Sequence, residues 1–306
     1  MIINKTGIAQ LRFSLFLLIS CFISACGDPD PKPAAGRSNQ FETSPEKFTI
    51  QSGIVDEASG LTESTNLSGY LWTMQDSGQP NSLYLISKDG KSIKEYNVPG
   101  SVNHDWEDIA SGAGPNSGTN YLYIADIGNN NFPMTETNII YRIPEINNIN
   151  SSFGADQLAK ITFRYPDGPK DAETLLLDPD TKDIFIISKE SDHTGIYRLP
   201  YPQSTTETVT AEKVGTIPSV VTATGGDISI DGKEIVIRTY ISVSYWTRKD
   251  GETISQTLSK SATKQLIVAL EPQGEGICFD RELAGFYTLS EKGNASGVTL
   301  NYYKRK

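Results

Sequence analysis

Cysteine and histidine are scarce in this sequence, whose 306 residues include three cysteines and two histidines. The histidines, His104 and His193, are far apart, and no cysteine stands at a metal-ligand spacing from either of them. Zinc and copper sites draw mainly on these two side chains, so the sequence argues against both metals. Cys278 lies in the apolar run "GICFD", which predicts a buried thiol rather than a nucleophile.

Basic residues are also few, with 27 lysines and arginines against 37 acidic residues and a net charge of −10. Removal of residues 1–25 would take away Lys5 and Arg12 and leave a charge of −12. A nucleic-acid partner needs a basic surface, so none is expected. The sequence also has no motif for a catalytic nucleophile or a phosphate-binding loop.

The main apolar run, "FSLFLLISCFISA", falls within residues 1–25, which carry no acidic residue and are too short to span a bilayer comfortably. This composition predicts a signal peptide. Residues Ile23–Cys26, "ISAC", resemble a bacterial lipobox, which implies cleavage before Cys26 and its lipidation; a plain signal peptide is the alternative. Residues 26–46 are rich in proline and polar side chains, which predicts a flexible tether before a folded domain at 47–306. We therefore expect a lipoprotein of the bacterial cell envelope, either periplasmic or exposed at the surface.

A short motif of acidic and apolar residues occurs five times along the chain. Its first residues follow one another at intervals of 48 to 66 residues: Ser59, Glu107, Glu173, Gly226 and Glu275. Each motif precedes β-rich runs bounded by Gly, Pro, Asn and Asp. A period of about 40–50 residues built from short strands is typical of a β-propeller with one four-stranded blade per repeat.

The fifth repeat ends one strand short, and the run Lys47–Val55 precedes the first repeat. Pairing of this N-terminal strand with the last blade would close the ring and leave no exposed sheet edge. We therefore predict an all-β, five-bladed propeller closed by its N-terminal strand. A sixth blade is the alternative if Glu252–Lys264, which has weak helical character, contains further strands.

Inner strands of a propeller line its central channel, so the repeat positions predict a ring of oxygen ligands there. Ca²⁺ accepts six to eight oxygens in loose geometry, which suits this set. The expected calcium ligands are Ser59, Glu107, Glu173, Asp227 and Glu275, with Glu57, Asp105, Asp108 and Asp171 nearby. The alternative is that these side chains cap backbone N–H groups and waters.

The ends of the second strands should open on the same face as this ring and form a funnel. The funnel residues predicted to contact a ligand are Asp76, Asp126, Lys189, Glu190, Arg238 and Glu291.

The phrases "DWEDIA", "YLYIADIGNN", "GGDISIDGKEIVIRTY" and "QGEGI" resemble those of secreted bacterial propeller proteins of unassigned activity. The predicted ring also resembles that of the soluble calcium-activated nucleotidase (apyrase) family, a five-bladed propeller. That resemblance implies a calcium shell of Ser, Glu, Glu, Ser and Glu, matched here by Ser59, Glu107, Glu173 and Glu275. Gly226 stands where the family has its second serine, so a backbone carbonyl or Asp227 would have to serve.

Two functions follow from these observations. The first is a membrane-anchored module that binds a small molecule or protein at the propeller face, with calcium as a structural ion. The second is a calcium-dependent hydrolase of phosphoanhydrides or phosphoesters, in which Asp108 or Glu190 takes a proton and Lys189, Arg238 or Lys292 holds phosphate. Pairing of these cations with neighbouring acids is the structural alternative to phosphate binding.

Overall fold

The structure is a computed structural model that describes residues 36–306. The chain divides into two units, 1–37 and 38–306, and every strand of the described residues lies in the second. The predicted signal peptide and Cys26 lie outside the described residues. Among those described, no helix is long and apolar enough to cross a membrane.

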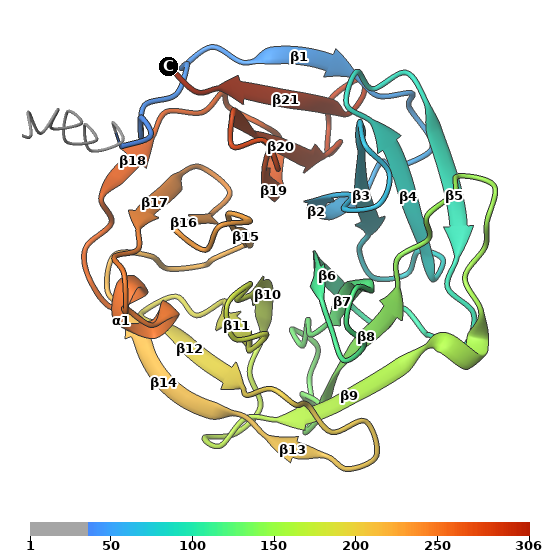
Figure 1. Cartoon of the computed structure of the whole chain (residues 1–306), viewed down its shortest axis with the longest axis vertical. Helices are drawn as coiled ribbons and strands as arrows, with labels where there is room; N and C mark the ends of the chain where they lie inside the picture. The colour runs from blue at the N-terminus through green and yellow to red at the C-terminus, as the bar shows by residue number, and fades with distance from the viewer. Residues whose placement is uncertain (1–35) are drawn as a thin grey trace, which may run out of the picture. The chain divides into compact units, whose positions relative to one another are not determined.

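Residues 38–306 form a β-propeller of five sheets arranged around a central axis (Figure 1). Blade 1 consists of β2 (Ala58–Glu63), β3 (Tyr70–Gln75), β4 (Ser82–Ser87) and β5 (Ile93–Asn97). Blade 2 consists of β6 (Trp106–Ala113), β7 (Asn120–Asp126), β8 (Asn138–Pro144) and β9 (Ala159–Arg164), with β13 (Val209–Thr210) added in parallel to β9. The 3₁₀ helix η1 (Ala155–Gln157) lies between β8 and β9.

Blade 3 consists of β10 (Ala172–Leu177), β11 (Ile184–Ser188), β12 (Thr194–Leu199) and β14 (Glu212–Ile217). Blade 4 consists of β15 (Gly225–Ile228), β16 (Glu234–Arg238), β17 (Val243–Thr247) and β18 (Lys264–Leu266), with the helix α1 (Ile254–Leu258) before β18. Blade 5 consists of β19 (Gln273–Phe279), β20 (Gly285–Glu291), β21 (Thr299–Lys304) and β1 (Glu46–Thr49).

The hydrophobic core is divided among the five interfaces between successive blades, each with its own cluster of buried side chains. Every blade is therefore covered on both faces, which explains why an inner strand such as β10 is buried at all six positions. The three tryptophans pack in these interfaces, and Trp72, Trp106 and Trp246 are almost fully buried. Cys278 is also buried, in agreement with the sequence.

The N-terminal strand closes the ring, as predicted. β1 pairs antiparallel with β21, from Glu46 opposite Tyr302 to Thr49 opposite Thr299. The inner strands β19 and β2 are also in contact, so the first and last blades are neighbours (Figure 1). Contacts extend further toward the N-terminus than the expected boundary at residue 47, because Phe41 bridges to Arg305 and its ring is buried.

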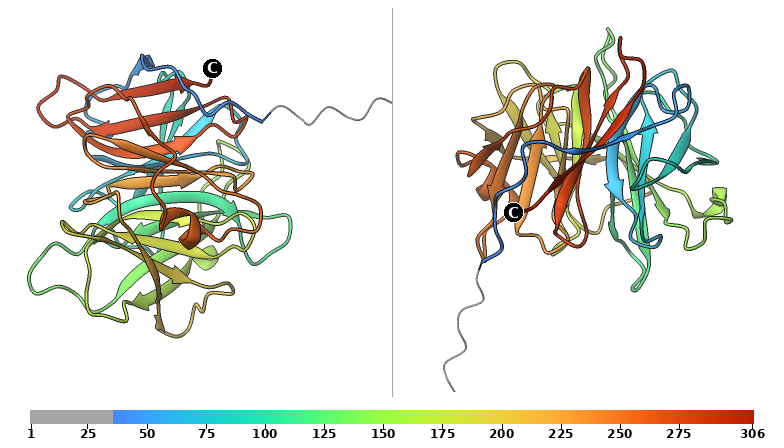
Figure 2. Two further views of the ribbon diagram at one scale, coloured as in Figure 1. Left: turned by 90° about the vertical axis from the view of Figure 1, so that its left-hand side faces the viewer. Right: turned by 90° about the horizontal axis from the view of Figure 1, so that it is seen from above.

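The structure has five blades and not six. The segment Glu252–Lys264, which could have contained strands of a sixth blade, contains α1 instead and ends at the start of the short edge strand β18. The N-cap residue of α1, Thr253, accepts a hydrogen bond from the Gln256 N–H. Figure 2 shows the ring from two sides, with strands running roughly along its axis.

Candidate metal centre at one mouth of the channel

The inner strands of four blades carry an irregularity near their first residues. The antiparallel register slips there by one residue, which leaves one residue of each strand without a partner opposite: Gly60, Glu107, Glu173 and Glu275. A bulge of this kind bends the strand and re-aims the side chain of the extra residue. In three blades the re-aimed side chain is a glutamate from the predicted ring.

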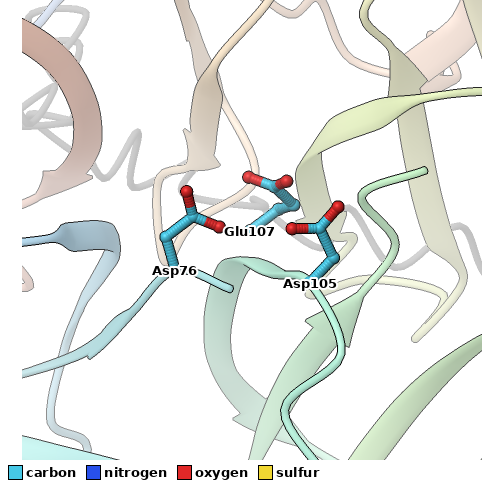
Figure 3. Close-up of side chains that lie close together, drawn as sticks. All are labelled: Asp76, Asp105 and Glu107. Atoms are coloured by element: carbon cyan, nitrogen blue, oxygen red, sulfur yellow. The ribbon is translucent and has the colours of Figure 1, made fainter. Parts of the chain in front are cut away.

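The carboxylates of Asp76, Asp105 and Glu107 lie together at this end of the channel. Each offers an oxygen that lies within 4.8 Å of one from each of the other two (Figure 3). Asp76 directly follows β3 of blade 1, whereas Asp105 and Glu107 flank the start of β6 in blade 2. The group therefore bridges two blades.

Backbone hydrogen bonds hold the loops that carry this group. The Asp105 N–H donates to Asp126 Oδ1 at 2.8 Å, and the Gly128 N–H donates to the Asp105 carbonyl at 3.2 Å. Asn103 donates from Nδ2 to the Asp76 carbonyl at 2.9 Å. The turn after β7 thus fixes Asp105, and the loop before β6 fixes Asp76.

Gly128 makes room for the acidic group. A Cβ atom at this position would lie 2.2 Å from Glu107 Oε1 and 2.4 Å from Asp105 Oδ2. A side chain at this position would therefore require the two carboxylates to move from the places they occupy.

Several buried oxygens of the acidic residues have no hydrogen-bond donor among the described residues: Asp105 Oδ2, Asp126 Oδ2, Glu173 Oε2 and Glu275 Oε2. Buried polar atoms in folded proteins are nearly always paired, because an unpaired one costs about 1–3 kcal/mol. Asp105, Glu173 and Glu275 are each at least 94% buried, with exposed fractions of 6%, 4% and 3%. Such oxygens fit a cation that would coordinate them.

The pKa values of these carboxyl groups are raised. Burial raises the pKa of Glu107 and Glu275 well above their usual range, and neighbouring carboxylates raise it further. Burial and the charge of Asp76 raise the pKa of Asp105 to about 6. Burial raises the pKa of Glu291 to about 7, with Glu57 and Asp76 adding to the effect. A bound divalent cation would stabilise the charged forms and reverse these shifts. The donor set of carboxylate oxygens suits Ca²⁺.

Lys189 enters the same site from blade 3. Its ammonium group forms an ion pair with Glu173 and donates a hydrogen bond of 2.7 Å to the Tyr240 hydroxyl. Burial raises the pKa of Glu173 to about 7, although the Lys189 charge acts in the opposite direction. Glu173 is thus partly neutralised from within the protein, whereas Glu107 and Glu275 make no ion pair within residues 36–306.

Ser59, predicted as a calcium ligand, lies next to Glu107. Its hydroxyl donates to the carbonyl oxygen of Glu107 at 2.5 Å, so it joins blade 1 to blade 2 at the start of their inner strands. Glu190 lies further out, where its carboxylate accepts a hydrogen bond from Ser188 and contacts Lys170 at 3.2 Å.

Two predicted site residues do not face this mouth. The carboxylate of Asp227 accepts hydrogen bonds of 2.8 Å from the N–H groups of Ile228 and Phe279, further along the channel. β15 has no register slip, so Gly226 stays opposite Ile237 and brings no oxygen-bearing side chain to the ring. Asp227 as a calcium ligand is therefore a correction to the sequence analysis.

Arg238 is the second correction. Its side chain is buried between blades 4 and 5, pairs with Glu271 and donates to the Gly276 carbonyl at 2.9 Å. It lies over Gly274, where a Cβ atom would be 1.8 Å from Nη2. Arg238 therefore joins blades and does not belong to the funnel.

The sequence pattern predicted Asp76 in the outer funnel and Asp105 only near the ring. It did not predict that Gly128 would leave space for the carboxylates. The motif "ADIGNN", which places a glycine two residues after the end of β7, was the available signal for Gly128.

Comparison with models of known protein families and with curated proteins finds no match to this sequence. Solved structures with a similar backbone fold include the PQQ-bound aldose sugar dehydrogenase from Streptomyces coelicolor. Its sequence is 10% identical, the TM-score is 0.48, and the match covers 87% of this chain and 100% of that one. An auxiliary nutrient binding protein from Bacteroides thetaiotaomicron has 11% identity and a TM-score of 0.47, over 87% of this chain and 74% of that one. A Trichoderma reesei protein of carbohydrate-active enzyme family AA12 has 8% identity and a TM-score of 0.47, over 90% and 100% of the two chains. Similarities at this level concern the backbone fold alone.

Proposed function

We propose that this protein is a binding module of the bacterial cell envelope whose propeller holds a calcium ion at one mouth of its channel. Asp76, Asp105 and Glu107 would bind the ion, with Glu173 and Glu275 close by. Two observations together carry the proposal. Several buried carboxylate oxygens have no donor within residues 36–306, and they lie beside three carboxylates whose oxygens are within 4.8 Å of one another.

A cation at this place would act first on stability. Asp76 belongs to blade 1, and Asp105 and Glu107 belong to blade 2, so one ion would tie two blades together. It would also offset the effects of burial and of neighbouring carboxylates, which together raise the pKa of Glu107. The ion would supply positive charge at this mouth, where a ligand with oxygen donors could complete the coordination of the ion.

The cations that could have held phosphate are already paired or buried, which favours ligand binding over phosphate hydrolysis. Lys189 is paired with Glu173, and Lys292 lies 2.6 Å from Asp56. Arg238, the third cation that could have held phosphate, is buried between blades. A calcium-dependent phosphohydrolase is therefore the second candidate function, after the binding module.

The experiment is a calorimetric titration of CaCl₂ into the chelator-treated full chain, together with a thermal unfolding curve. We expect saturable binding and a higher unfolding temperature for the unmodified protein, and loss of both in Glu107→Gln. Asp250→Asn is the matched control, because the Asp250 side chain is 92% exposed. Absence of calcium binding by the unmodified protein would refute the proposal.

A phosphate-release assay with nucleotides and a generic phosphoester separates the two functions. Calcium binding without turnover supports the binding module. Turnover that requires calcium and is lost in Glu107→Gln supports the hydrolase.

We further propose that the protein is anchored by lipid on Cys26, on the strength of the lipobox-like residues Ile23–Cys26. Metabolic labelling with a palmitate analogue should mark the unmodified chain and not Cys26→Ala. Equal labelling of the two proteins would rule the anchor out.

A further inference from the structure

A cavity of about 230 Å³ lies at the opposite mouth of the channel from the acidic group. Its wall includes the last residues of all five inner strands, among them Glu63, Ala113, Leu177, Ile228 and Phe279. The candidate metal ligands stand instead where these strands begin. Because a six-residue strand is about 20 Å long, the two sites are separate.

Much of the cavity wall is apolar. Ala110, Leu177 and Phe279 are buried core side chains, whereas Ile230 at the rim is 45% exposed. Ligand pockets are generally apolar, with a few polar groups that orient the ligand, and have volumes of roughly 300–1,000 Å³ for drug-sized molecules. A cavity of about 230 Å³ suits a smaller molecule with an apolar body.

The carboxylates in the wall are already paired. Glu63 lies 2.7 Å from Lys88 and accepts the Arg281 N–H at 3.0 Å. Asp280 accepts hydrogen bonds from the Glu282 N–H at 2.8 Å and from the Tyr302 hydroxyl at 3.0 Å.

The other two acids of the wall are paired as well. Asp178 forms an ion pair with Arg248 at 3.0 Å, and Asp227 accepts two backbone N–H groups. Each of the four acids in this wall therefore already has a partner within residues 36–306.

The two cations in the wall have donors to spare. The guanidinium of Arg281 makes no hydrogen bond or ion pair with the part of the chain that the structure describes, although it is half-buried. Lys182 Nζ makes one hydrogen bond, to the Gly114 carbonyl at 3.1 Å, and lies 5.0 Å from the centre of the Tyr201 ring. Arg281 offers the planar fork that matches a carboxylate.

We propose that this cavity binds a small organic carboxylate with an apolar body. The carboxylate would contact Arg281, assisted by Lys182, and the apolar body would lie against Leu177 and Phe279. This site is independent of the calcium proposal, because it uses other residues at the other mouth.

The experiment titrates benzoate into the full chain by calorimetry, with benzamide, benzylamine and inorganic phosphate as comparison probes. We expect saturable binding of benzoate, at least about tenfold weaker binding of benzamide, and no binding of benzylamine or phosphate. Arg281→Met keeps much of the apolar stem but removes the charge, so it should weaken benzoate binding at least about tenfold. Lys91→Met, whose lysine side chain is 83% exposed, should leave binding unchanged.

A second measurement does not depend on any variant. In the unmodified protein, intermolecular nuclear Overhauser effects should connect the benzoate ring with the methyl groups of Leu177 and the ring of Phe279. Equal affinity for benzoate and benzamide, unchanged binding in a folded Arg281→Met variant, or no benzoate binding up to about 10 mM would overturn the proposal.

Discussion

The carboxylate of Asp108 accepts a hydrogen bond of 2.9 Å from the backbone N–H of Leu175, which joins the inner strand of blade 2 to that of blade 3. Asp227 does the same between blades 4 and 5, where it accepts the Phe279 N–H at 2.8 Å. Both aspartates follow the ring position by one residue. This shared role explains why Asp227 could not replace the missing ligand at Gly226.

Asp108→Ala should destabilise the propeller. The change leaves the N–H groups of Leu175 and Ile109 without their acceptor in a buried position, which predicts a loss of about 1–3 kcal/mol in the free energy of unfolding. Asp108→Asn keeps an acceptor oxygen and should lose less. Urea unfolding provides the measurement, and Asp250→Ala, on an exposed side chain, should stay within about 0.5 kcal/mol of the unmodified protein. Equal stabilities of Asp108→Ala and the unmodified protein would contradict the joining role.

Gly128→Ala should weaken calcium binding while the fold is retained. Its methyl group would enter the space of the Glu107 and Asp105 carboxylates, with contacts of 2.2 and 2.4 Å unless they move. We expect calcium affinity to fall about tenfold or more, as when groups that orient metal ligands are altered. Calorimetry provides the measurement. Gly297→Ala is the control, since its nearest atom would be 3.9 Å away. Unchanged affinity in Gly128→Ala would place the ion elsewhere.

With chelator present, stability should fall as the pH rises from about 5 to 7. Asp105 and Glu173 have ordinary pKa values of 3.8 and 4.5, and burial raises these to about 6 and about 7 in the folded protein. Between the two sets of values the folded state binds more protons than the unfolded state, so the free energy of unfolding decreases with pH. Added calcium should raise the unfolding temperature more at pH 7 than at pH 5.

The matched variant for this pH effect is Glu291→Gln, because burial raises the pKa of Glu291 to about 7. The variant should show a shallower decline than the unmodified protein. An unfolding temperature that rises from pH 5 to pH 7 in chelator would show that these carboxyl groups are not neutral in the folded, metal-free protein.

Phe41→Ala should destabilise the closure of the ring. The Phe41 ring lies 5.1 Å from that of Phe286, and the Arg305 guanidinium lies 4.5 Å from its centre. Removal of a buried phenylalanine typically costs about 3–5 kcal/mol, and we expect a loss in this range for Phe41, which is 8% exposed. Phe132→Ala is the control, because Phe132 is 97% exposed. If the two variants unfold at the same denaturant concentration, the segment before β1 does not contribute to closure.

Blade number and closure could be predicted from the sequence because both follow from local patterns. The inner strands recur at Ser59, Glu107, Glu173, Gly226 and Glu275, and the last repeat lacks the strand that residues 46–49 supply. The same column predicted three glutamates of the channel mouth. The role of Asp76 could not be predicted, since it depends on the register slip that leaves Glu107 without a partner and on the meeting of two blades. The exclusion of Arg238 could not be predicted either, since it depends on the space over Gly274.

The propeller, its N-terminal closure and the acidic character of one mouth follow from strand periodicity and repeat length, which can be read along the chain. Three features depend instead on contacts between blades: Asp76 lies with Asp105 and Glu107, Asp227 joins two blades, and Arg281 keeps its donors at the other mouth. A side chain's role here depends on which donors and acceptors from other blades reach it. Those partners come from segments far away in the chain.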